Sequence, residues 1–340
     1  MENAREVRYP APRPPQRPTV TFLLIIMNSL VFLAMFMFRG GPGNIEVLLR
    51  FGALDPILVW QGEFYRLLTT IFLHIDLKHL LFNMFALYML GSLLEPFYGS
   101  RRFVFIYFLS GLAGNLVSQL FMEGISAGAS GAVLGLAGAL LSRISSIKGR
   151  VPEPSRRSFF FTILFLIIFD VLLGFTSEQI NNEAHIGGLL SGWWLSYAMV
   201  LTEKRTRWRN LMGRTASLAF VLGMILLTVC SLFPVWNARY FMALADAEYN
   251  QKDYPEAARY LERAVQIDPA IGATFGVTRA FRHPYRFLAR YFYDKQQFDK
   301  GITDGVSDVP SLVGVYRHNV WLKHGEATTL RDAVVRAAGY

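Results

Sequence analysis

Seven mainly apolar stretches, each roughly as long as a bilayer core is thick when helical, divide most of this 340-residue chain. Such stretches cross a membrane only as helices or closed barrels, because every backbone polar group must be satisfied internally. The fraction of charged residues, 17%, also favours a membrane protein, since soluble domains carry about 25%. We predict an all-α polytopic membrane protein with spans at 19–38, 79–97, 102–122, 130–147, 158–176, 184–202 and 213–236.

The charges between these spans indicate an orientation. Basic residues gather in the N-terminal tail and in the loops after the second, fourth and sixth spans, whereas the other short loops are mainly acidic. Short loops rich in Lys and Arg stay in the cytoplasm. The tail 1–18 is therefore expected in the cytoplasm of a multi-pass cell-membrane protein, and residues 237–340 outside it. The net charge of +9 forms no single binding face, which argues against a nucleic-acid partner.

Four polar side chains stand near the outer ends of three spans that run in the same direction. His79 and Asn83 open the second span, Ser130 opens the fourth, and His185 opens the sixth. A single such residue more often bonds its own backbone or a neighbouring helix than performs chemistry. Four groups with complementary roles at one depth favour a shared functional site.

Ser130 and His185 have the residue types needed for nucleophilic acyl transfer. The start of a helix at Ser130 favours a developing oxyanion, because unpaired N–H groups and the helix dipole point at it. Small residues recur every four positions on both helices, so close packing would bring the two side chains within hydrogen-bond reach. These residues are Gly131, Gly135 and Ala139 on one helix and Ala184, Gly188 and Gly192 on the other, with Gly128 permitting a bend ahead of Ser130.

His79 and Asn83 stand four residues apart and so share one face of the second span. Both can donate hydrogen bonds to an oxyanion. No carboxylate is clearly placed to orient His185, since Glu183 lies in a loop and Asp170 lies within the fifth span. A Ser–His dyad without an acid is therefore the preferred hypothesis.

A metal or cofactor site is not expected. His74 and His79 are five residues apart, unlike the two histidines of a His-Glu-x-x-His zinc peptidase, and no third ligand is evident. Cys230 is the only cysteine, which excludes an internal disulfide and a cysteine zinc site.

Three segments resemble the motifs of the rhomboid intramembrane serine proteases: HLLFN at 79–83, GASG at 128–131 and AHIGG at 184–188. The resemblance covers roughly residues 19–202 and implies a six-helix protease core. It also implies a role for each of four residues: Ser130 as nucleophile, His185 as base and then acid, and His79 and Asn83 as oxyanion donors together with the Ser130 amide. Its substrates would be membrane proteins whose transmembrane segments unwind near the outer leaflet.

Two positions depart from this family pattern. The residue four after the serine is often aromatic in the family and supports the histidine ring, but here it is Leu134. Asp170 stands where the family often has asparagine, and we interpret it as a water-facing structural residue. The first loop, 39–75, resembles a family element that lies partly in the outer leaflet. Its aromatic residues Trp60, Phe64, Tyr65 and Phe72 suit a membrane interface, and they would also suit any amphipathic loop.

The last hundred residues have the character of a soluble helical domain. Aromatic and small residues between 241 and 269 follow the spacing of a tetratricopeptide repeat, with 253–257 as the turn between its helices. A weaker echo runs through 288–301, and a final helix is predicted at 328–338. Since about three repeats are needed to bury a continuous core, this repeat should be capped or rest on another surface. It is a candidate site for a peptide or protein partner, or equally a packing appendage.

The expected architecture is a rhomboid-like six-helix core at 19–202, a basic loop and seventh transmembrane helix at 203–236, and a small extracytoplasmic α-helical repeat domain at 237–340. The expected function is serine-dependent cleavage of transmembrane protein substrates, with membrane lipid as the other partner. The alternative is a catalytically silent rhomboid-like adaptor that binds membrane proteins through its repeats, against which the intact Ser130 and His185 argue. A channel or transporter agrees less well with the sequence, because charges within the spans and paired broken helices are lacking.

Overall fold

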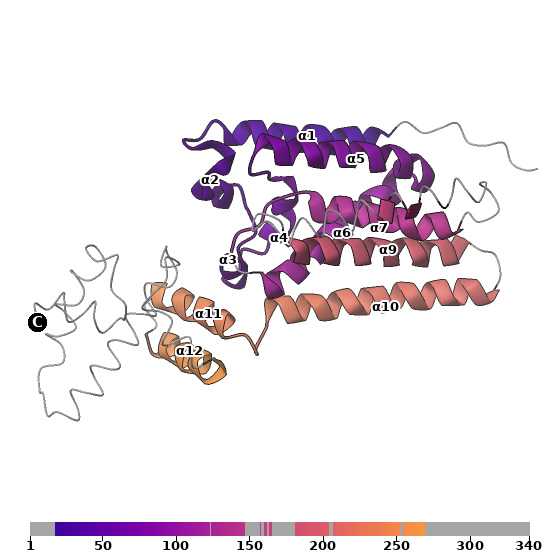
Figure 1. Cartoon of the computed structure of the whole chain (residues 1–340). Coiled ribbons are helices and arrows are strands. Elements are labelled where there is room, and N and C mark those ends of the chain that lie inside the picture. The colour runs from indigo at the N-terminus through magenta and orange to yellow at the C-terminus, as the bar shows by residue number, and fades with distance from the viewer. Residues whose placement is uncertain are drawn as a thin grey trace, which may run out of the picture. The chain divides into compact units, whose positions relative to one another are not determined.

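The computed structural model describes residues 18–122, 124–146, 157, 160–161, 163–164, 181–203, 207–251 and 254–268. Within them the regular structure is helical, apart from an isolated antiparallel β-bridge between Leu54 and Ser126. The helices are α1 (Thr19–Met35), η1 (Gly41–Gly43), α2 (Ile45–Arg50), α3 (Pro56–Trp60), α4 (Arg66–Thr69), η2 (Thr70–Phe72), α5 (Leu77–Tyr98), α6 (Ser100–Phe121), α7 (Ser130–Ser146), α9 (Asn182–Glu203), α10 (Arg207–Leu232), α11 (Ala238–Asn250) and α12 (Tyr254–Ile267) (Figure 1). The prediction of a helical protein is confirmed for these residues.

The long helices coincide with the predicted spans, except the fifth, 158–176, most of which lies outside the described residues. By length and composition α5, α6 and most of α10 can each cross a membrane. Helix α1 and the segment Ser130–Ile144 of α7 are shorter apolar helices. Several helices suited to cross a membrane are therefore present among the described residues, as predicted.

The largest boundary difference concerns α10, which begins at Arg207 and ends at Leu232 rather than covering 213–236. The basic residues at its start favour helix, and their long side chains can carry charge from an apolar helix to the lipid head groups. The early end has a local cause: Pro234 lacks the N–H that would continue the helix, and it disfavours helical geometry in the residue before it.

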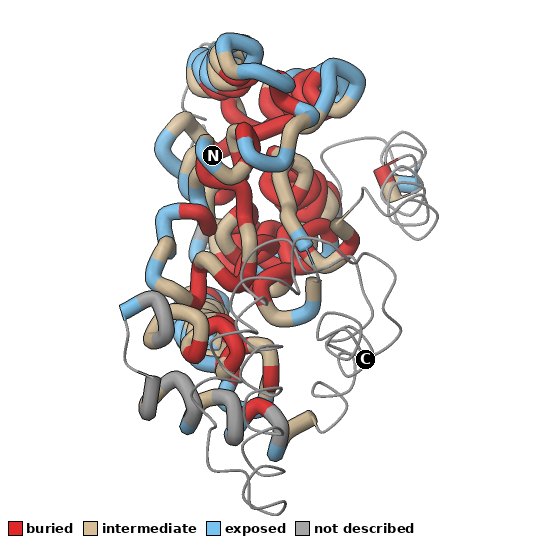
Figure 2. Tube along the Cα trace, turned by 90° about the vertical axis from the view of Figure 1, so that its left-hand side faces the viewer, coloured by how far each residue is buried: buried red, intermediate tan, exposed pale blue. Residues whose placement is uncertain are grey.

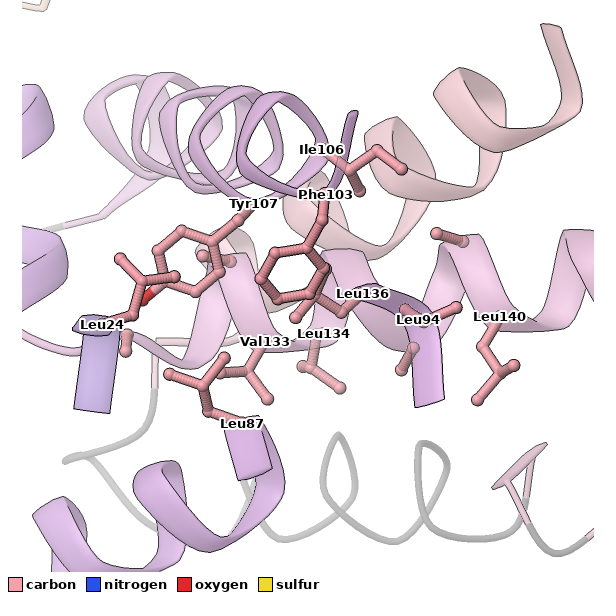
Figure 3. Packing of buried hydrophobic residues seen from close by; sticks show 14 of the residues in the cluster. Leu24, Leu87, Leu94, Phe103, Ile106, Tyr107, Val133, Leu134, Leu136 and Leu140 are labelled. Atoms are coloured by element: carbon pink, nitrogen blue, oxygen red, sulfur yellow. The ribbon is translucent and has the colours of Figure 1, made fainter. Parts of the chain in front are cut away.

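Contacts divide the chain into two compact units, the first within residues 1–56 and 64–231 and the second within 57–63 and 232–340. In the first unit α7 packs against α5, α6 and α9, and every residue from Ala132 to Leu140 is buried. Figure 2 shows that buried residues lie along the inner sides of the helices and that exposed ones lie on the outer turns. A helix that is apolar all round belongs in such a position. Figure 3 shows Val133 and Leu136 in the same buried cluster as Leu87 of α5. Ser130 thus begins the central helix of this unit.

A buried carboxylate joins three helices of the first unit. Glu95 of α5 is 0% exposed and accepts hydrogen bonds from the backbone N–H groups of Val20 and Thr21, from the Thr21 hydroxyl and from the Ser100 hydroxyl, at 2.7–2.9 Å. Pro18, which precedes α1, supplies no side-chain cap. Glu95 therefore satisfies the open N–H groups at the start of α1 from a neighbouring helix.

We expect Glu95→Ala to lower the free energy of unfolding by about 3 kcal/mol, because it leaves several buried donors without an acceptor. Glu95→Gln keeps one acceptor oxygen and should cost less. Thermal unfolding in detergent micelles measures both. Glu46→Ala, which removes an exposed carboxylate from the first turn of α2, is the matched control. If the Glu95→Ala and Glu46→Ala proteins unfolded at the same temperature, the capping role of Glu95 would be contradicted.

In the second unit, the segment 57–63 from the loop between α1 and α5 packs on α11. Trp60 is 6% exposed and meets Tyr240 edge to face at 5.9 Å, and Ile57 and Ala243 belong to the same buried cluster. The amide of Gln61 donates to the carbonyl oxygen of Ala243 at 3.3 Å. A single repeat is expected to rest on another surface, and this segment covers the apolar face of α11.

Two sequence expectations for these regions need correction. Trp60 does not occupy a membrane interface, since its ring is buried against Tyr240, although Phe64 and Tyr65 are half exposed and Phe72 is partly buried. The predicted turn at 253–257 is also wrong, because α12 already begins at Tyr254. A proline is tolerated in the first turn of a helix, where its missing N–H costs nothing. The predicted echo at 288–301 and helix at 328–338 lie outside the described residues.

Candidate functional site

The N-terminal ends of α7 and α9 meet and bring Ser130 to His185. Ser130 is the first residue of α7, and its Oγ lies 2.7 Å from Nε2 of His185 in the first turn of α9. The histidine is 4% exposed, and the serine is half-buried. This is the separation required between a nucleophile and its general base. The N–H of Val133 bonds to the carbonyl of Ala129, so the N–H groups of Ser130, Gly131 and Ala132 precede the first hydrogen bond of the helix and can face a negative charge beside Ser130.

Gly128 lets a third group approach the pair. Its φ of +155° lies in a region that residues with side chains rarely adopt. A Cβ atom built there would lie 3.0 Å from Cε1 and 3.1 Å from Nε2 of His79, and 3.5 Å from Oγ of Ser130. The imidazole of His79 and the hydroxyl of Ser130 therefore flank the same point of the backbone.

The position of His79 follows from how α5 begins. Asp76 caps the helix, its Oδ1 accepting a hydrogen bond from the N–H of His79 at 2.8 Å. Asn83, one turn further along, is 6% exposed and donates through Nδ2 to the carbonyl oxygen of His79 at 2.9 Å. One of its two amide hydrogens is thus engaged within α5. The structure brings Ser130, His185 and His79 together, and Asn83 lies one turn along α5 from His79.

His74 is a buried histidine beside this group. It lies outside the spans, in the link between η2 and α5, and is 0% exposed, with its ring centroid 5.0 Å from that of His79. Burial, together with the neighbouring imidazole of His79, lowers the pKa of His74 to about 3. His74 therefore stays neutral throughout the physiological range. Within the described residues no three His, Cys, Asp or Glu side chains gather as a candidate metal site.

Acid is expected to weaken the fold through His74. The unfolded chain takes up a proton near pH 6.5, whereas the folded chain does so only near pH 3. Stability should therefore fall by about 1.4 kcal/mol for each pH unit as the pH drops below 6.5, until it reaches the folded pKa. Unfolding temperatures of the protein and of His74→Gln, which cannot titrate, should diverge between pH 7 and pH 5. Parallel curves would contradict this assignment.

The small-residue faces of α7 and α9 lie directly against each other. A Cβ atom added at Gly131 would lie 3.1 Å from the carbonyl oxygen of Ala184. A methyl group at Gly188 would overlap the backbone of Gly131, and one at Gly192 would overlap the backbone of Gly135. Gly135 also faces Ser110 of α6, so α7 is confined on two sides. The close approach holds the first turns of both helices together.

Two further residues near the dyad carry no sequence motif and were missed. The side chain of Asn181, just ahead of α9, donates to the hydroxyl of Ser126, in the loop before α7, at 2.8 Å. An asparagine preceding a predicted helix is a capping signal, which could have identified Asn181. No comparable signal marks Ser126.

Other predicted positions have simpler outcomes. Leu134, found where an aromatic support was expected, is 8% exposed and belongs to the buried cluster of α7 (Figure 3). Asp170 lies outside the described residues. At the start of α9, one residue before His185, the side-chain oxygen of Asn181 accepts the N–H of Ala184 at 2.9 Å.

Two segments of the chain match known protein families. Residues 61–202 match the model of the rhomboid domain, and residues 238–271 match that of the tetratricopeptide repeat. The second match supports the repeat region expected after the last span.

Several named proteins are similar to this chain. The rhomboid protease GluP of Bacillus subtilis (strain 168) is 35% identical over 257 residues, which cover 74% of this chain and 48% of that protein. RHOMBOID-like protein 5 of Arabidopsis thaliana is 38% identical over 164 residues, covering 47% and 52% of the two chains. The rhomboid YdcA of Bacillus subtilis (strain 168) is 32% identical over 191 residues, covering 55% of this chain and 92% of that protein. The chain thus spans about half the length of the first two relatives and nearly all of the third.

Proposed function

Because this chain belongs to the rhomboid family of multi-pass membrane proteins, we propose that it is an intramembrane serine endopeptidase acting through a Ser130–His185 dyad. The observation that carries the proposal is the 2.7 Å hydrogen bond between Oγ of Ser130 and Nε2 of His185. Relatives named as rhomboid proteases support the reaction class.

In the proposed reaction Oγ of Ser130 attacks the carbonyl carbon of a peptide bond, and Nε2 of His185 takes the hydroxyl proton. The tetrahedral oxyanion is stabilised by the Ser130 N–H at the start of α7, by His79 and by Asn83. His185 then gives its proton to the leaving amine. A water molecule, deprotonated by His185, hydrolyses the acyl-enzyme and regenerates the hydroxyl. The nearness of the His79 ring to Gly128 and Ser130 supports its oxyanion role.

The proposed substrates are membrane proteins whose transmembrane segments unwind near the outer leaflet. The charge distribution supports a cytoplasmic N-terminus in the cell membrane. With this orientation the dyad lies near the outer leaflet, and residues 237–340 lie on the outer side of the membrane. Water must reach the acyl-enzyme, and a shallow site provides it. The tetratricopeptide region is proposed to recruit a peptide or protein, in keeping with its family match.

Reconstitution tests this function. Purified protein in liposomes is incubated with a set of single-span membrane proteins, and product masses locate the cleaved bonds. We expect cuts in the outer part of the substrate span, together with labelling of Ser130 by a fluorophosphonate. Absence of both cleavage and labelling in a folded protein would favour the silent adaptor. Reporter fusions after residue 240 test the orientation, which a cytoplasmic signal would overturn.

A further inference from the structure

A hydrogen bond between Asn181 and Ser126 connects the two segments that lead into the dyad. Asn181 stands four residues before His185, and Ser126 stands four residues before Ser130. Building on the proposed protease function, we propose that Asn181 is a positioning residue, which acts with the Ser126 hydroxyl to fix His185 relative to Ser130.

Asn181 first fixes the start of α9. Its Oδ1 accepts the N–H of Ala184 at 2.9 Å, and its backbone carbonyl accepts the N–H of His185 at 3.2 Å. A side-chain oxygen that accepts an N–H three residues on is a helix cap. The first turn of α9, which carries His185, is therefore bonded directly to Asn181.

The other end of the same amide reaches two other parts of the first unit. Nδ2 of Asn181 lies 2.8 Å from Oγ of Ser126, 2.6 Å from Oγ of Ser118 and 3.1 Å from Sδ of Met122. Ser118 and Met122 stand at the end of α6. Because one planar group makes these contacts and the helix cap, α9 cannot shift along its axis without breaking some of them.

Ser126 in turn is held firmly by its backbone. Its N–H and carbonyl exchange hydrogen bonds of 2.9 Å with Leu54, and the same carbonyl accepts the Thr70 hydroxyl at 2.6 Å. The carbonyl of Thr70 accepts the N–H of Gly128 at 3.1 Å. The loop before Ser130 is thus anchored independently of Asn181, and the Ser126 hydroxyl is a fixed reference for α9.

The Asn181–Ser126 hydrogen bond restrains the axial position of α9, which the packing of small residues does not. Contacts between glycine-rich faces set how near α7 and α9 lie, but they are non-directional, whereas hydrogen bonds fix axial position. A displacement of about 1 Å between reacting groups can cost about 100-fold in rate. A directional bond four residues from each dyad member limits that displacement.

Asn181→Ser and Ser126→Ala test the proposal. Serine still caps a helix but is too short to reach Ser126, and alanine removes only the hydroxyl and leaves the Ser126 backbone bonds. We expect each variant to lower kcat for a cleaved membrane substrate about tenfold, with KM within about twofold of the parent. The rate at which a fluorophosphonate labels Ser130 should fall alike, since in that reaction Ser130 Oγ displaces fluoride from phosphorus while His185 takes the proton.

Matched variants separate positioning from stability. Asn237→Ser makes the same change at the residue whose Oδ1 accepts the N–H of Arg239 near the start of α11, and its labelling rate should equal that of the parent. Ser126→Thr keeps a hydroxyl and should restore most of the rate. The double variant Asn181→Ser/Ser126→Ala should lose little beyond either single change.

The outcomes are distinct. Equal labelling and kcat in the parent, Asn181→Ser and Ser126→Ala would overturn the positioning role. So would a loss that follows only a lower unfolding temperature, or one that raises KM alone. A parent protein in which Ser130 is never labelled would instead contradict the proposed protease function itself.

Discussion

Alanine at Ser130 or at His185 is expected to reduce cleavage of a membrane substrate by about 10⁴-fold or more. The first change removes the atom that forms the acyl-enzyme. The second removes the base that lies 2.7 Å from the Ser130 hydroxyl. Because the two groups act as one unit, the double variant should be scarcely less active than either single variant. Initial rates of product formation in liposomes measure the effect.

A control serine separates chemistry from folding. Ser217→Ala on α10 removes a hydroxyl that donates to the carbonyl of Gly213 in the same helix, at 2.9 Å, and should retain the parent's rate. Ser130→Ala should unfold at the parent's temperature. Cleavage by Ser130→Ala above about 1% of the parent's rate would mean that another group is the nucleophile.

Gly188→Ala is expected to have the second largest effect, although it adds a single methyl group. That methyl would overlap the carbonyl group and Cα of Gly131, and backbone atoms cannot rotate away as a side chain could. Helices α7 and α9 must therefore move apart within one turn of Ser130 and His185. We expect about a 100-fold loss of cleavage and a destabilisation of about 1–3 kcal/mol.

The matched control is Gly223→Ala on α10, where an added Cβ would meet no atom within 4 Å. Since alanine favours helix more than glycine, this change should leave cleavage intact and raise stability slightly. Cleavage rates and unfolding temperatures of both variants measure the difference. If Gly188→Ala behaved like Gly223→Ala, the close approach of α7 and α9 would not be what holds the dyad together.

Much of the fold could be predicted because its causes are local. Apolar stretches of bilayer length predicted where the described long helices lie, to within a few residues in most cases. The exceptions have local causes that were passed over: the cap at Asp76 starts α5 two residues early, and Pro234 shortens α10. The turn placed at 253–257 failed in the same way, since a proline at the start of a helix was mistaken for a residue outside it.

Contacts between distant residues could not be predicted, because nothing in the neighbouring sequence identifies the partner. Glu95 caps a helix 74 residues away, and Asn181 binds a serine 55 residues away. Trp60 looked like an interfacial aromatic residue until Tyr240 proved to cover it. A hydrogen bond or ring contact of this kind depends on where the fold places its two ends.

By itself the sequence determined that this chain is a helical membrane protein, and it predicted that Ser130, His185 and His79 stand near the beginnings of three spans that run in the same direction. Those conclusions rest on the thickness of the bilayer, the sign of loop charges and the periodicity of helices. Each of these can be evaluated from a short stretch of sequence without knowing which distant residues it contacts. Only the tertiary structure decided the 2.7 Å approach of Ser130 to His185, the place of His79 against Gly128, and the Asn181–Ser126 link. Atomic distances follow from how whole helices pack, and packing is a property of all the helices at once.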